Sequence, residues 1–387
     1  MQTSVEAKPL ISIASVSLES SSNNESITSF EGRRKCRFHD QKPRLLVFIC
    51  STILAFTLLP HLLTNLSHHC RSTAAGARLN RPLHLTTLYS VPSYTINGSF
   101  SFPAAAFASV FHSSLGPAHI NATVTLSTTA DVAIVTYSIV SDNELAAKAT
   151  HVSAEIFDNN LIVQTTTLSE TTHAIVTVFL NIALPRVISD FDFTGNMASL
   201  VYAGPNVRDT FSVHDLKVGS VAIKTALESQ RFFVNVNVGS VDFHAPVSTA
   251  QVSVLTASGS IEVWDTLEAR DTIVLNTSAG SINVVAAIIG GFRELVVGSR
   301  AGSVKLGSVQ PNTEAVEIKI SVSAGSVDAQ FFGFKGVYSA SVVIGSVEVL
   351  GKDVHPSGRG TGWVGDANGE GIIKASSSVG SIILLFE

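Results

Sequence analysis

Apolar and polar side chains alternate at every second position in short runs along the C-terminal part of the chain. Residues 241–243 (Val-Asp-Phe) and 261–263 (Ile-Glu-Val) are two of these runs. Alternation with a period of two is typical of a β-strand with one buried face. A Gly-Ser-Val or Gly-Ser-Ile triplet opens each run, and the triplets begin at Gly219, Gly239, Gly259, Gly280, Gly302, Gly325, Gly345 and Gly380.

The triplets recur at intervals of 20, 20, 21, 22, 23, 20 and 35 residues, with one further copy at Gly307. A recurring period of this size is the signature of a repeat protein. Such a length fits one coil of a β-solenoid, in which successive coils stack ~4.8 Å apart and each glycine stands where the backbone bends or takes a positive φ. The first inward side chains after the glycines would then form one column, in the order Val221, Val241, Ile261, Ile282, Val304, Val327, Val347 and Ile382.

We therefore predict an all-β protein in which residues 216–387 form about eight coils of 20–23 residues, with residues 351–371 as a loop excursion. One coil cannot bury its own apolar face, so isolated coils should not fold. Residues 85–215 are rich in β-branched residues but lack the triplet. They are predicted to be either irregular first coils or a separate small β domain that caps the open end. A meandering antiparallel sandwich with hairpins every ten residues is the alternative fold.

The N-terminal part follows another pattern. Residues 1–44 are polar and rich in serine and threonine, which predicts a disordered tail. Residues 45–66 contain no Asp, Glu, Lys or Arg and are long enough to cross a bilayer as one helix. Six Lys or Arg residues precede this span within residues 33–44 and three follow it, which places the tail in the cytosol.

This organisation predicts a single-pass type II membrane protein. Residues 67–84 would be a linker, and the β-rich part would lie outside the cell or in a lumen, with the plasma membrane favoured over the Golgi. A cleaved signal peptide is the alternative, but 44 leading residues are too many for its charged n-region. Sequons at Asn97, Asn121 and Asn276 predict N-glycosylation and agree with export.

Composition narrows the classes of function. A net charge of −5 and a pI near 6.2 give no basic footprint for nucleic acid. The three cysteines, Cys36, Cys50 and Cys70, all lie in the first 70 residues, so no disulfide framework supports the β-rich part. Cys70 can pair with its copy in a second chain, which would give a homodimer.

Catalytic patterns are scarce. Asp190-Phe191-Asp192 matches the Asp-x-Asp pair of Golgi glycosyltransferases, but the chain lacks the alternating strands and helices of a nucleotide-sugar fold. A solvated strand face is the preferred interpretation of this pair. There is no Gly-x-Ser-x-Gly sequence for a serine hydrolase. We predict no catalytic residue, no metal site and no cofactor.

One outward column of the predicted coils places Asp242 beside Glu262 and Asp328 beside Glu348. Polysaccharide lyases and hydrolases on β-solenoids use such carboxylates, and Trp363 in the loop excursion has a ring that can stack on a sugar. Asp242, Glu262 and Trp363 are therefore the candidate ligand face. The competing interpretation is a solvated polar face, with Trp363 docked on the solenoid.

The Gly-Ser-Val/Ile triplet followed by alternating apolar residues resembles the adhesin domains, built as β-solenoids, that are known from bacteria. The preceding segment, from Ala183-Leu184-Pro185 to Asp215-Leu216, is similar to fungal membrane-anchored proteins with an adhesin-like domain of unknown function. The resemblance covers roughly residues 175–387 and implies a non-catalytic role at a cell surface, with a surface glycan or protein as partner. A carbohydrate-active enzyme on the same scaffold, a lyase or hydrolase, is the alternative function.

Overall fold

The structure is a computed structural model that describes residues 93–129, 131–168 and 174–387. These residues are β-strand almost throughout, so the described part of the chain is all-β. Its helical elements are the 3-10 turn η1 (Ala104–Ala106) and the short helix α2 (Glu144–Lys148). Within the described ranges no helix is long and apolar enough to cross a membrane. The predicted tail 1–44, span 45–66 and linker 67–84, with all three cysteines, lie outside those ranges.

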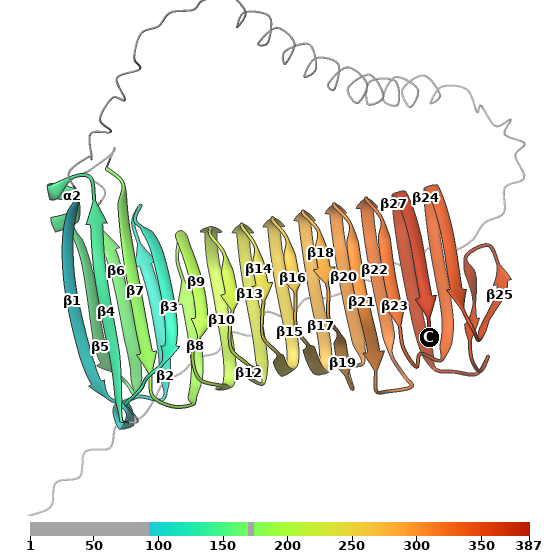
Figure 1. The fold of residues 1–387 in the computed structure, drawn as a ribbon, viewed down its shortest axis with the longest axis horizontal. Coiled ribbons are helices and arrows are strands. Elements are labelled where there is room, and N and C mark those ends of the chain that lie inside the picture. The colour runs from blue at the N-terminus through green and yellow to red at the C-terminus, as the bar shows by residue number, and fades with distance from the viewer. Residues whose placement is uncertain (1–92, 130, 169–173) are drawn as a thin grey trace, which may run out of the picture. The chain divides into compact units, whose positions relative to one another are not determined.

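The first strands form a mixed arrangement at one end of the fold (Figure 1). They are β1 (Tyr94–Pro103), β2 (Ser109–Leu115), β3 (His119–Leu126), β4 (Val132–Ser141), β5 (Thr150–Phe157), β6 (Asn160–Thr167) and β7 (Val176–Leu184). β4 pairs antiparallel with both β1 and β7, and β5 pairs antiparallel with β6. β2 and β3 instead pair in parallel with β6 and β7 on one side and with β8 and β9 on the other.

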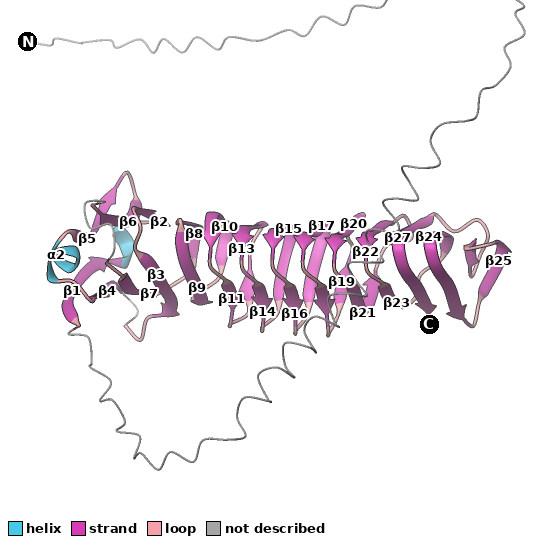
Figure 2. Ribbon diagram, turned by 90° about the horizontal axis from the view of Figure 1, so that it is seen from above, coloured by secondary structure: helices cyan, strands magenta, loops and turns pink. Residues whose placement is uncertain are grey.

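From β8 onward the strands stack in parallel, one repeat apart, as Figures 1 and 2 show. These strands are β8 (Ile188–Thr194), β9 (Met197–Ala203), β10 (Val207–Val218), β11 (Val221–Ile223), β12 (Leu227–Glu228), β13 (Arg231–Val238), β14 (Val241–Phe243), β15 (Val247–Ser258), β16 (Ile261–Val263), β17 (Leu267–Ala279), β18 (Ile282–Val284), β19 (Ile288–Gly290), β20 (Glu294–Ala301), β21 (Val304–Pro311), β22 (Glu317–Ala324) and β23 (Val327–Phe331). Val221 pairs with Val241, which pairs with Ile261, so the register equals the period of the sequence. Antiparallel hairpins every ten residues, the alternative fold, do not occur in this stack.

Each turn of the chain in the stack has three sides. The long side consists of β8, β10, β13, β15, β17, β20 and β22, and from β10 onward it ends at the repeated glycine. The short side follows the bend and consists of β9, β11, β14, β16, β18, β21 and β23. The third side is the two-residue ladder in which Leu227, Val247, Leu267 and Ile288 are successive neighbours.

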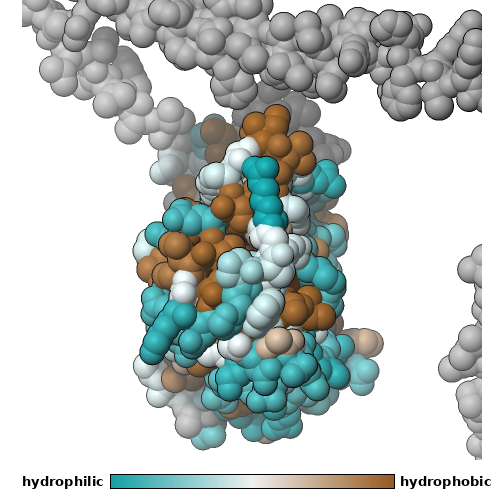
Figure 3. Space-filling view, turned by 90° about the vertical axis from the view of Figure 1, so that its right-hand side faces the viewer, coloured by the Kyte–Doolittle hydropathy of each residue, from teal (hydrophilic) through white to brown (hydrophobic). Residues whose placement is uncertain are grey.

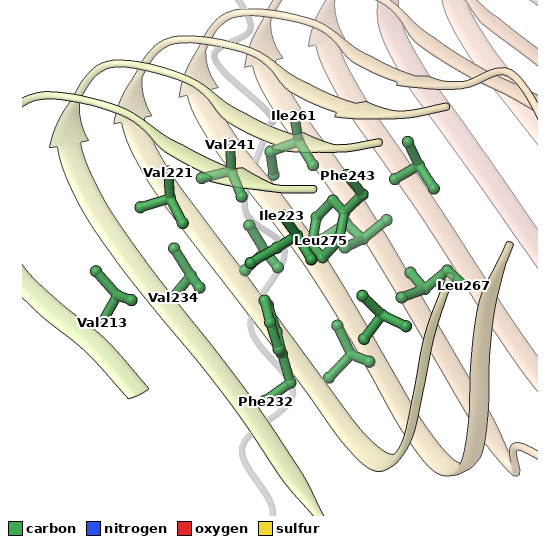
Figure 4. Packing of buried hydrophobic residues seen from close by; sticks show 14 of the residues in the cluster. Val213, Val221, Ile223, Phe232, Val234, Val241, Phe243, Ile261, Leu267 and Leu275 are labelled. Carbon is green, nitrogen blue, oxygen red and sulfur yellow. The ribbon is translucent and has the colours of Figure 1, made fainter. Parts of the chain in front are cut away.

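One continuous apolar core lies between these sides (Figure 4). Val221 and Val241 point inward from the short side and Phe232 from the long side, and each is at most 1% exposed. Phe211 and Phe232 stack in parallel with ring centroids 4.9 Å apart, as side chains in equivalent positions of neighbouring turns do. Each buried aliphatic or aromatic side chain contributes about 1.5–3 kcal/mol, but only while neighbouring turns cover it.

The eight triplet glycines share one backbone conformation, with φ between 143° and 155°. A Cβ on Gly239 would lie 1.4 Å from the carbonyl oxygen of Gly219, and one on Gly259 would lie 1.8 Å from that of Gly239. The glycines therefore stand one above another at the bend between the long and short sides, where no side chain fits.

The last turns do not follow the order of the sequence. They consist of β24 (Gly336–Gly351), β25 (Val354–Gly358), β26 (Thr361–Val364) and β27 (Gly371–Phe386). β27 lies between β22/β23 on one side and β24 on the other, and it is parallel to all three. In the inward column Ile382 therefore precedes Val347, which corrects the predicted order. The long interval makes this exchange possible because residues 351–371, predicted as a loop excursion, include the antiparallel hairpin β25–β26 that carries the chain back.

Candidate functional site

The structure brings two members of the candidate ligand face together. Asp242 on β14 and Glu262 on β16 are register neighbours on the outer surface of the short side. Ser240 Oγ donates a hydrogen bond to Asp242 Oδ2 at 2.9 Å. Asn283 follows Glu262 and Lys305 follows Asn283, so the column mixes charges and an amide.

The second predicted carboxylate pair is not adjacent. Asp328 pairs with Ile383 of the inserted strand β27, and Ile383 pairs with Glu348. Asp328 and Glu348 are thus two steps of the stack apart, ~10 Å, and cannot act as a close pair. The exchange of the last two turns is the reason, and the spacing of the triplets does not reveal it.

Trp363 lies far from the two carboxylates. It belongs to β26, pairs across the backbone with Val337 of β24, and stacks on the ring of His355 with centroids 5.4 Å apart. At least five steps of the stack, roughly 24 Å, separate this position from Glu262. The three residues of the candidate ligand face therefore do not form one site.

The Asp-x-Asp pair has ordinary polar partners. Asp190 accepts a hydrogen bond from Ser109 Oγ at 3.1 Å, and Asp192 Oδ1 lies 3.0 Å from His214 Nε2. His214 Nδ1 lies 3.1 Å from Asp215 Oδ2. Partial burial lowers the pKa of His214, but hydrogen bonds and charges from Asp215 and Asp192 outweigh it and raise the pKa above its ordinary value. Among the described residues no group of three or more His, Cys, Asp or Glu side chains is placed to hold a metal ion.

A feature that sequence reasoning missed is a shallow groove on the outer surface of the long side, which we call the polar groove. Two adjoining hollows of about 550 Å³ each form it, and both are lined by Asn235 and Ala257. The remaining lining is Ser113, Ser114, Leu115, Thr194, Gly195, Asn196, Asp215, Leu216, Lys217, Asn237, Leu255, Thr256, Asn276, Thr277, Ser278, Gly298, Ser299, Arg300, Ser321 and Ser323.

The floor of the polar groove combines small residues such as Gly298 and Ser321 with larger uncharged ones in the same register. Leu255 pairs with Asn276, Asn276 with Gly298 and Gly298 with Ser321. Within the stack that begins at β8, the groove crosses the strands from Thr194 to Ser321 on β22, which is six steps or roughly 29 Å. Residues 113–115 of β2, the neighbour of β8, extend it by one further strand. Most of its polar groups are hydroxyls and amides, which are uncharged.

A signal for this groove is present in the sequence. The side chains four and two residues before each triplet glycine point outward. In the five repeats from Gly239 to Gly325 these ten positions hold small or neutral polar residues, except for Leu255 and Arg300. Charged residues such as Asp242 and Glu262 do not indicate such a column, because its side chains are mostly neutral.

The predicted glycosylation sites differ in their surroundings. Asn97 is exposed on β1, whereas Asn121 on β3 and Asn276 on β17 are half-buried in strands paired on both sides. Asn276 lies within the polar groove, and the hydroxyl of Thr277 in the same sequon is buried and donates to the carbonyl oxygen of Gly259 at 2.9 Å.

Comparisons with known proteins find likeness only in structure. No family model matches the sequence, and no curated protein matches it. The structure of the chain aligns with that of a candidate adhesin from Bacteroides fragilis (12% identity, TM-score 0.33, 76% of this chain and 97% of that one). It also aligns with those of a candidate cell adhesion protein from Clostridium sporogenes (9%, 0.25, 76% and 100%) and a candidate lipid-binding protein from Parabacteroides distasonis (14%, 0.38, 74% and 96%).

Proposed function

We propose that this protein is a non-catalytic, adhesin-like β-solenoid that holds an extended neutral glycan along the polar groove. The observation that carries the proposal is the groove itself, an open channel across seven turns whose lining is mainly serine, threonine and asparagine. In the same proposal residues 45–66 tether the protein as a single-pass type II membrane protein, with the groove outside the cell or in a lumen.

The chemistry of the lining selects the class of ligand. Amide groups such as those of Asn235 and Asn237 both donate and accept hydrogen bonds, which suits hydroxyl groups. An anionic polymer would need a row of Lys or Arg, whereas the groove has only Lys217 and Arg300 at separate points and Asp215 near the first. A neutral polysaccharide satisfies the lining without an uncompensated charge.

The geometry also predicts how affinity is distributed. Each hydrogen bond contributes only about 0.5–1.5 kcal/mol net, so a ligand that spans one turn binds weakly. A ligand that runs along the stack collects contacts from several turns, and affinity should rise with oligosaccharide length until the groove is filled.

The test is binding of the full-length protein to immobilised neutral oligosaccharides (glucose, mannose and N-acetylglucosamine oligomers), with uronic acid oligomers as the charged comparison. Ala257→Trp fills the point where the two hollows join, and we expect a loss of binding of ~10-fold or more because water-exposed hydrogen bonds cannot be rebuilt around the indole. Ala222→Trp on the outer surface of the short side is the matched control and should bind like the wild type.

Absence of binding to every neutral oligomer, or unchanged binding by Ala257→Trp, would contradict the proposal. The in-register neighbours Asp242 and Glu262 favour one alternative, a glycoside hydrolase or lyase, because retaining glycosidases hold two carboxyl groups about 5 Å apart. Cleavage of a bound oligosaccharide that is lost in both Asp242→Ala and Glu262→Ala would establish that alternative.

A further inference from the structure

The outermost turn at the C-terminal end has an incompletely paired strand. The inner edge of β24 pairs with β27 along its length, from Gly336 with Gly371 to Gly351 with Phe386. On the outer edge β26 pairs only with residues 336–339, and the carbonyl of Gly360 accepts the N–H of Ala340. Among the described residues no strand pairs with the outer edge of residues 341–351, which we call the free edge.

The free edge carries exposed apolar side chains on its outward face and incompletely covered ones on its inward face. Val343 is 81% exposed, Ile344 62% and Leu350 44%. Val347 and Val349 occupy the positions of the fully buried Val241 and Phe243, yet here they are only partly covered. The view onto this end shows hydrophobic patches interspersed with hydrophilic residues (Figure 3).

Natural proteins protect strand edges with lysine, proline, a bulge or a covering element. The free edge contains no Lys, Arg or Pro, and Glu348 is its only charged residue. The hairpin β25–β26 shields the first part of β24 and stops at Ala340. A row of backbone donors and acceptors beside exposed aliphatic side chains is therefore open to another strand.

An occupant of this edge must be an extended, apolar and almost uncharged strand with a bend at its middle. β24 itself has these properties, and each copy of the chain presents it at the same place. Pairing of two such edges brings no row of like charges together because Glu348 is the only charged residue on each.

We propose that the free edge is a self-association site at which two copies of this chain pair edge to edge around a two-fold axis. Two identical edges related by such an axis must run antiparallel. The two cores become continuous when Val342 lies opposite the partner subunit's Val349, since both side chains pack toward the core. This register places Val343 opposite the partner subunit's Glu348. The interface involves neither Cys70 nor the polar groove.

Cross-linking tests the register. In the full-length chain with Cys36, Cys50 and Cys70 replaced by serine, we expect Val343→Cys with Glu348→Cys to give a disulfide-linked dimer on mild oxidation. The matched control is Asn237→Cys with Asp242→Cys, the same two positions of a turn inside the stack, where neighbouring strands occupy both edges. A cross-linked dimer in the first variant and none in the second supports the proposal. No dimer in either, or equal amounts in both, refutes it.

Sedimentation tests the association itself, under reducing conditions that exclude a Cys70 disulfide. Val343→Lys with Ile344→Lys places charges on the edge, and we expect the dimer dissociation constant to rise ~10-fold or more. Val218→Lys, at a similarly exposed valine inside the stack, should leave it unchanged. The proposal is wrong if the wild-type chain stays monomeric while the amides of residues 341–351 resist hydrogen exchange. In that case a segment of the same chain covers the edge.

Discussion

Replacement of a single triplet glycine should reveal how tightly the turns are stacked. In Gly259→Ala the new Cβ would lie 1.8 Å from the carbonyl oxygen of Gly239, where ordinary contacts are near 3.4 Å. Two neighbouring turns must separate, which costs about 1–3 kcal/mol as an overpacking effect. Alanine must also adopt a φ of 146°, which costs about 1–3 kcal/mol more.

We therefore expect Gly259→Ala to lower the free energy of unfolding by about 4 kcal/mol, a large share of the 5–15 kcal/mol typical of a folded protein. Gly291→Ala is the matched control, because no heavy atom lies within 4 Å of its added Cβ and its φ is not in the positive range. It should change stability by less than about 0.5 kcal/mol.

Chemical denaturation followed by far-ultraviolet circular dichroism measures both variants against the wild type. Hydrogen exchange locates the effect, since the amides of Gly239 and Val241 donate to the turn of Gly259 at Ser258 and Ser260 and should lose protection first. Equal stability of the two glycine variants would refute close stacking of the glycine column.

Two further results are expected. In the cysteine-free background, Ser326→Cys with Ser381→Cys should form an intramolecular disulfide, because Ser381 Oγ lies 3.2 Å from Ser326 Oγ. Ser326→Cys with Ser346→Cys should form none. The reverse outcome would restore the sequential order of turns. Burial lowers the pKa of His112, which stacks on Phe193 at 4.4 Å, to about 4. In the unfolded chain the His112 imidazole is protonated below about pH 6.5, so its neutral buried form stabilises the fold fully only above that pH. The free energy of unfolding should fall by about 3 kcal/mol toward pH 4. Denaturation of the wild type and of His112→Phe at pH 7.5 and 4.5 should show a smaller loss in the variant.

Both ends of the stack show the same departure from sequential order. β2 and β3 lie between β6/β7, which come later in the chain, and β8/β9, just as β27 lies between β22/β23 and β24. The strand next to each end is thus held on both sides by parallel neighbours, and residues 188–215 join the repeats in one stack. This arrangement leaves β24 outermost, and for that reason the free edge consists of a triplet-bearing strand.

The sequence by itself determined the all-β class, the bends at the eight triplet glycines and the inward side chains of the turns that carry them. These features are local, because the two-residue alternation decides which face is buried, and the glycine is required wherever one bend stacks on the next. Val241, Ile261 and Ile282 illustrate this, since each is predicted inward from its own run and each is fully buried.

Only the tertiary structure decided which turn lies next to which. Gly345 and Gly380 carry nearly identical triplets, so either strand fits on the turn that contains Gly325, and alternation holds no information to choose between them. The return path through the hairpin β25–β26 makes the choice, and it separates Asp328 from Glu348. The polar groove likewise depends on neighbours one turn apart, because Gly298 lines a hollow together with Asn276 and Ser321 of the adjoining turns.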